Sequence, residues 1–416
     1  MQLIGLNKPI ILWIGEFLRI GISFLILRKL LQLCGVSIAG QYLSIITVVM
    51  LIPRLLDFGA PQAIAYFSRV HKSKGSTLVR LIISHVMLAT LVASIIAWLL
   101  QFFPFESSEV IILVHIYSPL LAVIMITELT VLLGISTFIP IGLYAAHAVT
   151  NLIPPVTVLV GLSILGVFMA SPVEVGQLLV LFAVASMFGM IAMISGVYLG
   201  RFSYGVKIFS IKNFYQYAIH SYGSGVSKLI AQRLDRLMLT MLLSSAGYAQ
   251  YSMAISVRDL CTLPANLHAQ TAKNAQFDLA VNSHNEGRRF LKIMTLTWFI
   301  GALILGILLL PFWQVIVGFL FKNDYQITVE AISILAFSCA PLSTYAFSLN
   351  HLYAIRRPGL VTAISLLSLF TAITLLWGGV SLFGGVLGAA IAVTVCAFLN
   401  ATFALITALL AKPLSA

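Results

Sequence analysis

The amino-acid sequence predicts an all-α polytopic membrane protein, with twelve transmembrane helices in two six-helix lobes around a central cavity. Three observations support this fold class: the composition, the succession of long apolar segments and the placement of charge. Of the 416 residues, 60% are hydrophobic and 9% are charged, and the mean hydropathy is +1.06. Soluble domains carry roughly 25% charged residues and cannot bury this much apolar surface. The composition therefore excludes a soluble enzyme.

The apolar segments provide twelve spans of about 20 residues or more, the length that crosses a bilayer. Helices are expected because each one satisfies its own backbone hydrogen bonds in lipid. We place the spans near residues 10–33, 38–64, 79–100, 109–133, 138–165, 174–199, 214–243, 248–270, 291–310, 327–350, 357–377 and 382–410. Six spans fall in each half, so we expect an N-terminal lobe at 1–200 and a C-terminal lobe at 201–416.

Charge in the loops predicts the orientation. With a cytoplasmic N-terminus, the inward loops and the two ends hold fifteen of the 24 lysines and arginines, whereas the outward loops hold only Lys322. Glu106, Glu109 and Asp324 lie outside instead. This asymmetry follows the positive-inside rule and predicts that both termini are cytoplasmic. The net charge of +12 thus reflects topology and indicates no nucleic-acid partner.

The two halves resemble each other at an offset of 209 residues. This offset aligns the stretch 39–42 with 248–251, Arg19 with Lys228, and Asp57 with Asn266. With six spans in each half, the matches suggest a parallel repeat about an axis along the membrane normal, which is typical of transporters.

Eight basic residues remain inside or at the edges of spans once the loops are subtracted. Each costs about 2.5–3.5 kcal/mol at a helix centre, so together they require an explanation. Arg28 and Lys29 lie near a span end, where long side chains reach the interface. The other six are candidates to bind a large anion such as pyrophosphate, because arginine binds phosphate oxygens in pairs. They are Arg19, Arg54, Lys228, Arg233, Arg236 and Arg258.

Local ion pairing is the alternative role for these cations. Glu16 lies three residues before Arg19, and Asp57 lies three residues after Arg54, so each pair shares a helix face. Lys228 has no acid three or four residues away. Arg258 is adjacent to an acid, Asp259, but neighbouring residues point about 100° apart on a helix. Arg233 and Arg236 form either a second anion site or partners of an acid between them, Asp235.

The acids in the spans are candidates either for coupling transport to H+ or Na+ or for structural roles. They are Glu16, Asp57, Glu128, Asp235 and Asp259. Glu128 has no basic residue within four positions, which favours a coupling role. A protonated glutamate that hydrogen-bonds a neighbouring helix is the equal alternative. Coupling to the membrane potential is a further option.

Catalytic signatures are missing from the sequence. It contains no GxxxxGK[ST] phosphate loop and no HExxH motif, and its four cysteines are scattered singly. We therefore expect no catalytic residues, no metal site and no cofactor. The run Gly384-Gly385-Val386-Leu387-Gly388 contains a GxxxG spacing, which suits close helix packing.

Three stretches resemble bacterial polysaccharide transporters of the Wzx type. Residues 53–60, PRLLDFGA, are similar to the family's "DFG" end of the second helix. Residues 235–254, from Asp235 to Ala254, resemble its "D...L...vG.Y..A" stretch, and residues 382–392 resemble the "G..GaAiA" opening of the last span.

This resemblance implies a member of the multidrug/oligosaccharidyl-lipid/polysaccharide flippase superfamily. It implies two six-helix lobes and translocation of undecaprenyl-pyrophosphate-linked oligosaccharide, such as an O-antigen repeat unit of lipopolysaccharide, to the periplasmic leaflet of the bacterial inner membrane. Arginines line the cavity in the first, second and eighth helices of the related lipid II flippases; Arg19, Arg54 and Arg258 fall in the corresponding helices. A polysaccharide polymerase and a chain-length regulator are the partners it suggests.

Two other function classes stay open from the sequence. One is a multidrug or small-molecule exporter of the same superfamily, whose cavity should be anionic or aromatic to suit cationic drugs. The other is a membrane-embedded enzyme that modifies polysaccharide, although the chain has no large outward loop to hold a catalytic domain.

Overall fold

The computed structural model contains only helices in the part of the chain that it describes. This part comprises residues 7–61, 63–64, 84–88, 90–91, 116–138, 143–168, 173–199, 212, 214–216, 218–219, 222, 235–272, 276, 279, 283–321, 326–355 and 357–412. Much of the predicted third span, 79–100, and much of the seventh, 214–243, lie outside it.

By helix packing the chain divides into two compact units, Met1–Val226 and Ser227–Ala416. The boundary that we predict between residues 200 and 201 lies outside the described residues. The helices described for the first unit are α1 (Asn7–Leu55), α5 (Ser118–Phe138), α6 (Tyr144–Phe168) and α7 (Val175–Leu199). Those of the second unit are α9 (Ser245–Thr271), α11 (His284–Phe321), α12 (Gln326–Phe337), α13 (Cys339–Ala354), α14 (Pro358–Phe383) and α15 (Gly385–Leu410).

Eight helices or helix pairs in the described residues are long and apolar enough to cross a membrane. Their outward side chains include many large apolar residues, among them Phe370, Trp377 and Leu382, each more than half exposed. So much exposed apolar surface is typical of contact with lipid. The chain is therefore a multi-pass, all-α membrane protein.

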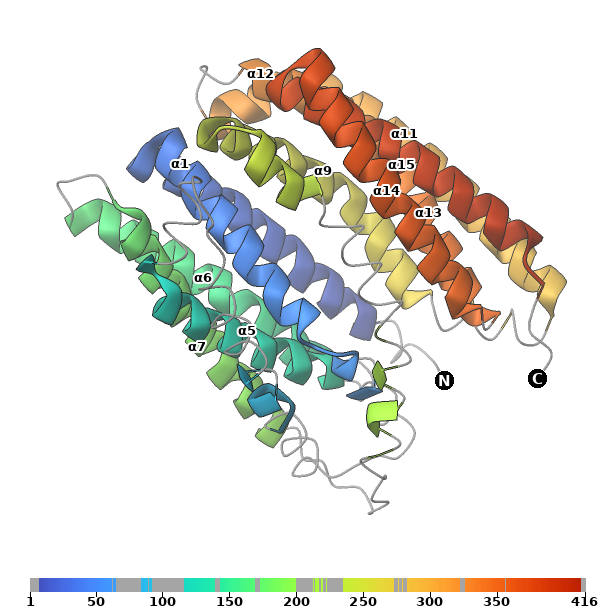
Figure 1. The fold of residues 1–416 in the computed structure, drawn as a ribbon, viewed down its shortest axis with the longest axis horizontal. Helices are drawn as coiled ribbons and strands as arrows, with labels where there is room; N and C mark the ends of the chain where they lie inside the picture. Colours follow the sequence, from blue (N-terminus) through green and yellow to red (C-terminus); the bar gives the residue numbers. More distant parts are fainter. Residues whose placement is uncertain are drawn as a thin grey trace. The chain divides into compact units, whose positions relative to one another are not determined.

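Helix α1 contains two of the predicted spans. It has 49 residues, and the backbone at Gly35 (φ 74°, ψ 174°) is not helical. A straight helix of that length would extend roughly 73 Å, more than twice the apolar thickness of a bilayer. Only glycine readily adopts this conformation, so the sequence places the bend between the spans predicted at 10–33 and 38–64. In Figure 1, α1 turns back on itself as a helical hairpin.

The tenth predicted span, 327–350, is divided into α12 and α13 at Ser338. Pro341 has no N–H and cannot donate to the carbonyl of Phe337, which favours an interruption of the helix at this turn. Ser338 instead makes a tighter turn, in which its N–H and its hydroxyl both donate to the carbonyl of Leu335, at 3.0 and 2.6 Å. The predicted ninth span, 291–310, is part of a longer helix, α11.

Close packing of α14 on α15 depends on two glycines. In Figure 1 these helices lie side by side at the end of the chain. A Cβ atom on Gly388 would lie 2.1 Å from the carbonyl oxygen of Gly379, and one on Gly379 would lie 2.7 Å from that of Gly388. The GxxxG spacing thus marks a close helix contact, as the sequence predicts.

We expect Gly388→Ala to destabilise the second unit by about 1–3 kcal/mol, because the new methyl group overpacks the α14–α15 contact. Thermal unfolding of the purified protein in detergent measures the effect. The matched control is Gly378→Ala, since a Cβ on Gly378 meets nothing within 4 Å. Its melting temperature should stay the same or rise, because alanine is the better helix former. Equal melting temperatures for the two variants would contradict this account of the contact.

Candidate functional site

Four charged side chains gather inside the second unit. Arg258 and Asp259 lie on α9, and Asp235 and Arg236 lie on the helical segment 235–242. Tyr251 joins them from α9, two turns before Arg258 and on the same helix face. We refer to these five residues as the C-terminal charge cluster. It brings together four of the residues singled out from the sequence, Arg236, Arg258, Asp235 and Asp259.

Asp259 contacts both arginines of this cluster. Its Oδ2 atom lies 2.5 Å from Arg236 Nη2, and its Oδ1 atom accepts from Arg258 Nη2 at 2.8 Å and from Arg258 Nε at 3.2 Å. The expectation that Arg258 and Asp259 point apart is wrong. The Arg258 side chain is long enough to fold back onto its neighbour, whatever the angle between their Cα–Cβ bonds.

Asp235 is the second acid of the cluster. The hydroxyl of Tyr251 donates to Asp235 Oδ2 at 3.0 Å, and Arg258 Nη1 lies 4.0 Å from the same oxygen. Asp235 Oδ1 is buried and accepts no hydrogen bond from a described residue. The sequence leaves open whether Arg236 pairs with Asp235. In the structure Arg236 pairs with Asp259, and the cation near Asp235 is Arg258.

Burial differs between the two acids. The side chains of Arg258 and Asp235 are 11% and 13% exposed, and that of Arg236 is 23% exposed, whereas Asp259 is 40% exposed. The described members of the cluster carry two positive and two negative charges. Inside a protein this balance is what makes buried charges tolerable, because an unpaired ion is costly to desolvate. Asp259 is the member most accessible from outside.

The start of α13 contacts the same turn of α9. Cys339 Sγ lies 3.6 Å from the carbonyl oxygen of Arg258, to which its thiol donates. Cys339 follows directly after Ser338, where α12 ends. The break between α12 and α13 therefore lies against the backbone that carries Arg258.

The first unit holds a second group of charges, on α1 and α5. Arg19 binds Glu16 through Nε and Nη2, both 2.8 Å from Oε2, so the predicted i, i+3 pair is confirmed. Arg54 is exposed and forms no ion pair with a described carboxylate, although it interacts electrostatically with Glu128 and Asp57. Arg19 and Arg54 thus each have negative charge nearby.

Glu128 on α5 is bound from α7. The hydroxyl of Ser186 donates to Glu128 Oε1 at 2.7 Å. Glu128 thereby contacts a neighbouring helix, which is the geometry expected of a structural glutamate. The bond is equally compatible with a carboxyl group that exchanges a proton, so the coupling role stays a prediction.

The DFG residues form the turn that ends the second half of α1. Asp57 does not pair with Arg54; its Oδ1 accepts the N–H of Gly59 at 2.8 Å. Phe58 and Gly59 have φ values of 45° and 76°, in the left-handed region. The hydroxyl of Tyr222 donates to the carbonyl of Leu55 at 2.5 Å, and its ring lies 5.6 Å from that of Phe58. Here Asp57 has a structural role that its spacing from Arg54 does not reveal.

Two predicted cations, Lys228 and Arg233, lie outside the described residues. Among those that are described, no group of three or more histidine, cysteine, aspartate or glutamate side chains lies close enough to hold a metal ion.

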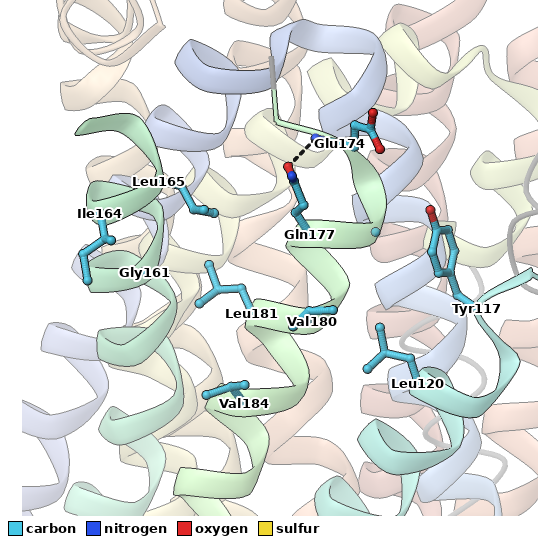
Figure 2. Close-up of a pocket in the computed structure, with 11 residues that line it drawn as sticks. Tyr117, Leu120, Gly161, Ile164, Leu165, Glu174, Gln177, Val180, Leu181 and Val184 are labelled. Atoms are coloured by element: carbon cyan, nitrogen blue, oxygen red, sulfur yellow. Dashed lines mark hydrogen bonds between the residues drawn. The ribbon is translucent and has the colours of Figure 1, made fainter. Parts of the chain in front are cut away.

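A groove of about 620 Å³ opens between α5, α6 and α7 in the first unit. Figure 2 shows its apolar lining, which includes Leu165, Val180 and Leu181. Its polar side chains are those of Tyr117, Glu174 and Gln177; the amide oxygen of Gln177 accepts the N–H of Glu174 at 3.1 Å. Its described lining holds one carboxylate and no basic side chain, so the groove offers no cation to a phosphate.

Comparisons with known proteins identify the fold. No protein-family model matches the chain, and no curated protein matches its sequence. Solved structures match along nearly the whole chain. The Vibrio cholerae MATE transporter VcmN in its bent form is 15% identical, with a TM-score of 0.63 over 97% of this chain and 96% of that one.

Two other structures extend the comparison. The lipid II flippase MurJ in an inward closed conformation is 16% identical, with a TM-score of 0.66 over 96% of this chain and 87% of its own. A Pyrococcus furiosus transporter of the MOP superfamily, described as having a binding pocket of reverse polarity that suggests a different function, is 13% identical, with a TM-score of 0.70 over 97% and 94%. The chain therefore has the fold of this superfamily.

We expect Arg236 and Asp259 to be energetically coupled, because one oxygen of Asp259 contacts Arg236 directly. A double-mutant cycle with Arg236→Gln and Asp259→Asn should give a coupling energy of about 1–3 kcal/mol in unfolding experiments on the purified protein in detergent. The control cycle combines Arg236→Gln with Glu330→Gln on α12, since Glu330 is exposed and forms no described ion pair with Arg236. Its coupling should be below about 0.5 kcal/mol. Equal coupling energies in the two cycles would refute the contact.

Proposed function

We propose that this protein is a flippase that moves undecaprenyl-pyrophosphate-linked oligosaccharide, such as an O-antigen repeat unit, from the cytoplasmic to the periplasmic leaflet of a bacterial inner membrane. The observation that carries the proposal is the convergence of two guanidinium groups, those of Arg236 and Arg258, on one carboxylate. Two planar cations that share one anion also suit a pyrophosphate, whose oxygens accept hydrogen bonds in pairs.

The fold is a second, independent support for this proposal. MurJ, which shares it, is described as a lipid II flippase. The three sequence stretches that resemble Wzx-type transporters add the polysaccharide branch, and their DFG residues form a defined turn at the end of α1. A protein that binds the diphosphate of a lipid carrier needs cations at membrane depth, and the sequence predicts basic residues within the spans, where their cost calls for a function.

In the proposed mechanism, Arg236 and Arg258 bind the diphosphate while the lipid chain stays in the bilayer. Further positive charge along the path of the diphosphate comes from Arg19, Arg54, Lys228 and Arg233. An inside-negative potential favours outward movement of negative charge by about 2.3 kcal/mol per charge per 100 mV. If transport is coupled to H+ or Na+, the candidate coupling residues are Glu128, Asp57, Asp235 and Glu16. A polymerase and a chain-length regulator would use the delivered repeat units.

A multidrug or small-molecule exporter is the second candidate function. It is favoured by the MATE transporter among the structural matches. The acids in both units also offer charge to a cationic drug. Efflux of a cationic dye such as ethidium, lost on deletion of the gene while surface polysaccharide stays normal, would establish this function in place of the first.

We expect deletion of the gene in its host to leave intact lipid-linked repeat units in the cytoplasmic leaflet and to abolish surface polysaccharide. Wild-type protein should restore the polymer, whereas Arg258→Gln should restore about a tenth or less, because it removes half of the paired positive charge. Lys29→Gln is the matched control, since Lys29 lies near a span end and has no role in the proposed site; it should restore polymer fully at equal membrane abundance. Repeat units that reach the periplasm but stay unpolymerised would point to an enzyme.

A further inference from the structure

Asp259 holds the position that a bound phosphate would take. One of its oxygens contacts Arg236 and the other contacts Arg258, at 2.5 and 2.8 Å. A phosphate group bridging two guanidiniums would use two of its oxygens in the same way. The cations that the proposed function requires are therefore already occupied by an anion that belongs to the chain.

The two acids of the cluster are not equivalent. Asp235 is 13% exposed, accepts a hydrogen bond from the hydroxyl of Tyr251 and is the more buried counter-charge of Arg258. Asp259 is 40% exposed and lies on the accessible side of the same arginine. An anion that approaches the cluster from outside encounters Asp259 before it can reach Arg258, which is 11% exposed.

We propose that Asp259 is a built-in competitor of the substrate, a tethered carboxylate that closes the cationic site and must be displaced by the diphosphate. This inference rests on the proposed function and specifies how the same site is regulated. No covalent step is involved: the ion pairs of Asp259 with Arg236 and Arg258 are exchanged for ion pairs with phosphate oxygens, and Asp259 turns toward solvent.

Competition of this kind gives selectivity by charge. A tethered group acts at a high effective concentration, so an acetate or chloride ion with a single charge cannot displace it at millimolar levels. A pyrophosphate group carries more charge and more acceptor oxygens, and it gains more from two guanidiniums than a carboxylate does. After release, Asp259 returns to the arginines, which opposes rebinding and restores the neutral cluster.

Removal of the competitor should therefore tighten anion binding. The test uses the full-length protein in detergent, with inorganic pyrophosphate as the probe and isothermal titration calorimetry as the measurement. We expect Asp259→Asn to bind pyrophosphate at least tenfold more tightly than wild type. Asp259→Glu keeps the carboxylate and should stay within about threefold of wild type. Arg258→Gln should weaken binding in both the wild-type and the Asp259→Asn background.

The charge-balanced variant Arg236→Gln/Asp259→Asn guards against loss of folding from an unpaired arginine. It should bind more weakly than Asp259→Asn alone, because one of the two guanidiniums is gone. If Asp259→Asn fails to tighten binding while Arg258→Gln weakens it, the competitor role is wrong and the proposed cationic site survives. If neither arginine substitution changes the affinity, the proposed phosphate site is itself refuted.

Discussion

Mutual neutralisation of buried charge is the constraint on which the rest of this structure depends. Arg236 and Arg258 are stable inside the second unit because Asp235 and Asp259 contact them, and the four charges sum to zero. Burial of an unpaired ion is costly, so the chain supplies the counter-charge from its own helices. The same rule holds in the first unit, where Glu16 binds Arg19.

The surrounding helices place this cluster next to an interruption in the fold. Cys339 follows directly after the break between α12 and α13, and its thiol contacts the carbonyl of Arg258. By contrast, α14 and α15 pack so closely at Gly379 and Gly388 that their backbones touch. The second unit thus combines a tightly packed helix pair with a broken helix beside its charges.

Much of the fold follows from the sequence, because hydropathy, glycine and proline act locally. A glycine or a proline explains each of three features: the bend at Gly35, the turn at Ser338 before Pro341 and the close helix contact at Gly388. The Glu16–Arg19 pair was predictable for the same reason, since i, i+3 spacing fixes a shared helix face. The partners of Arg236 and Glu128 were not predictable, because Asp259 and Ser186 come from other helices. The contact between Arg258 and Asp259 does not follow from backbone geometry, because the angle between their Cα–Cβ bonds ignores the length of an arginine side chain.

The central claim is that this chain moves a lipid-linked diphosphate across a bilayer by means of paired cations. The most direct test is reconstitution of the purified protein in liposomes with labelled lipid-linked oligosaccharide extracted from the host, placed in one leaflet. A membrane-impermeant enzyme that cleaves the exposed glycan then reports how much substrate has changed sides. The account predicts protein-dependent transfer of intact substrate, accelerated by a potential that is negative on the side of origin. Unchanged leaflet distribution, with the protein folded and the potential applied, would contradict it.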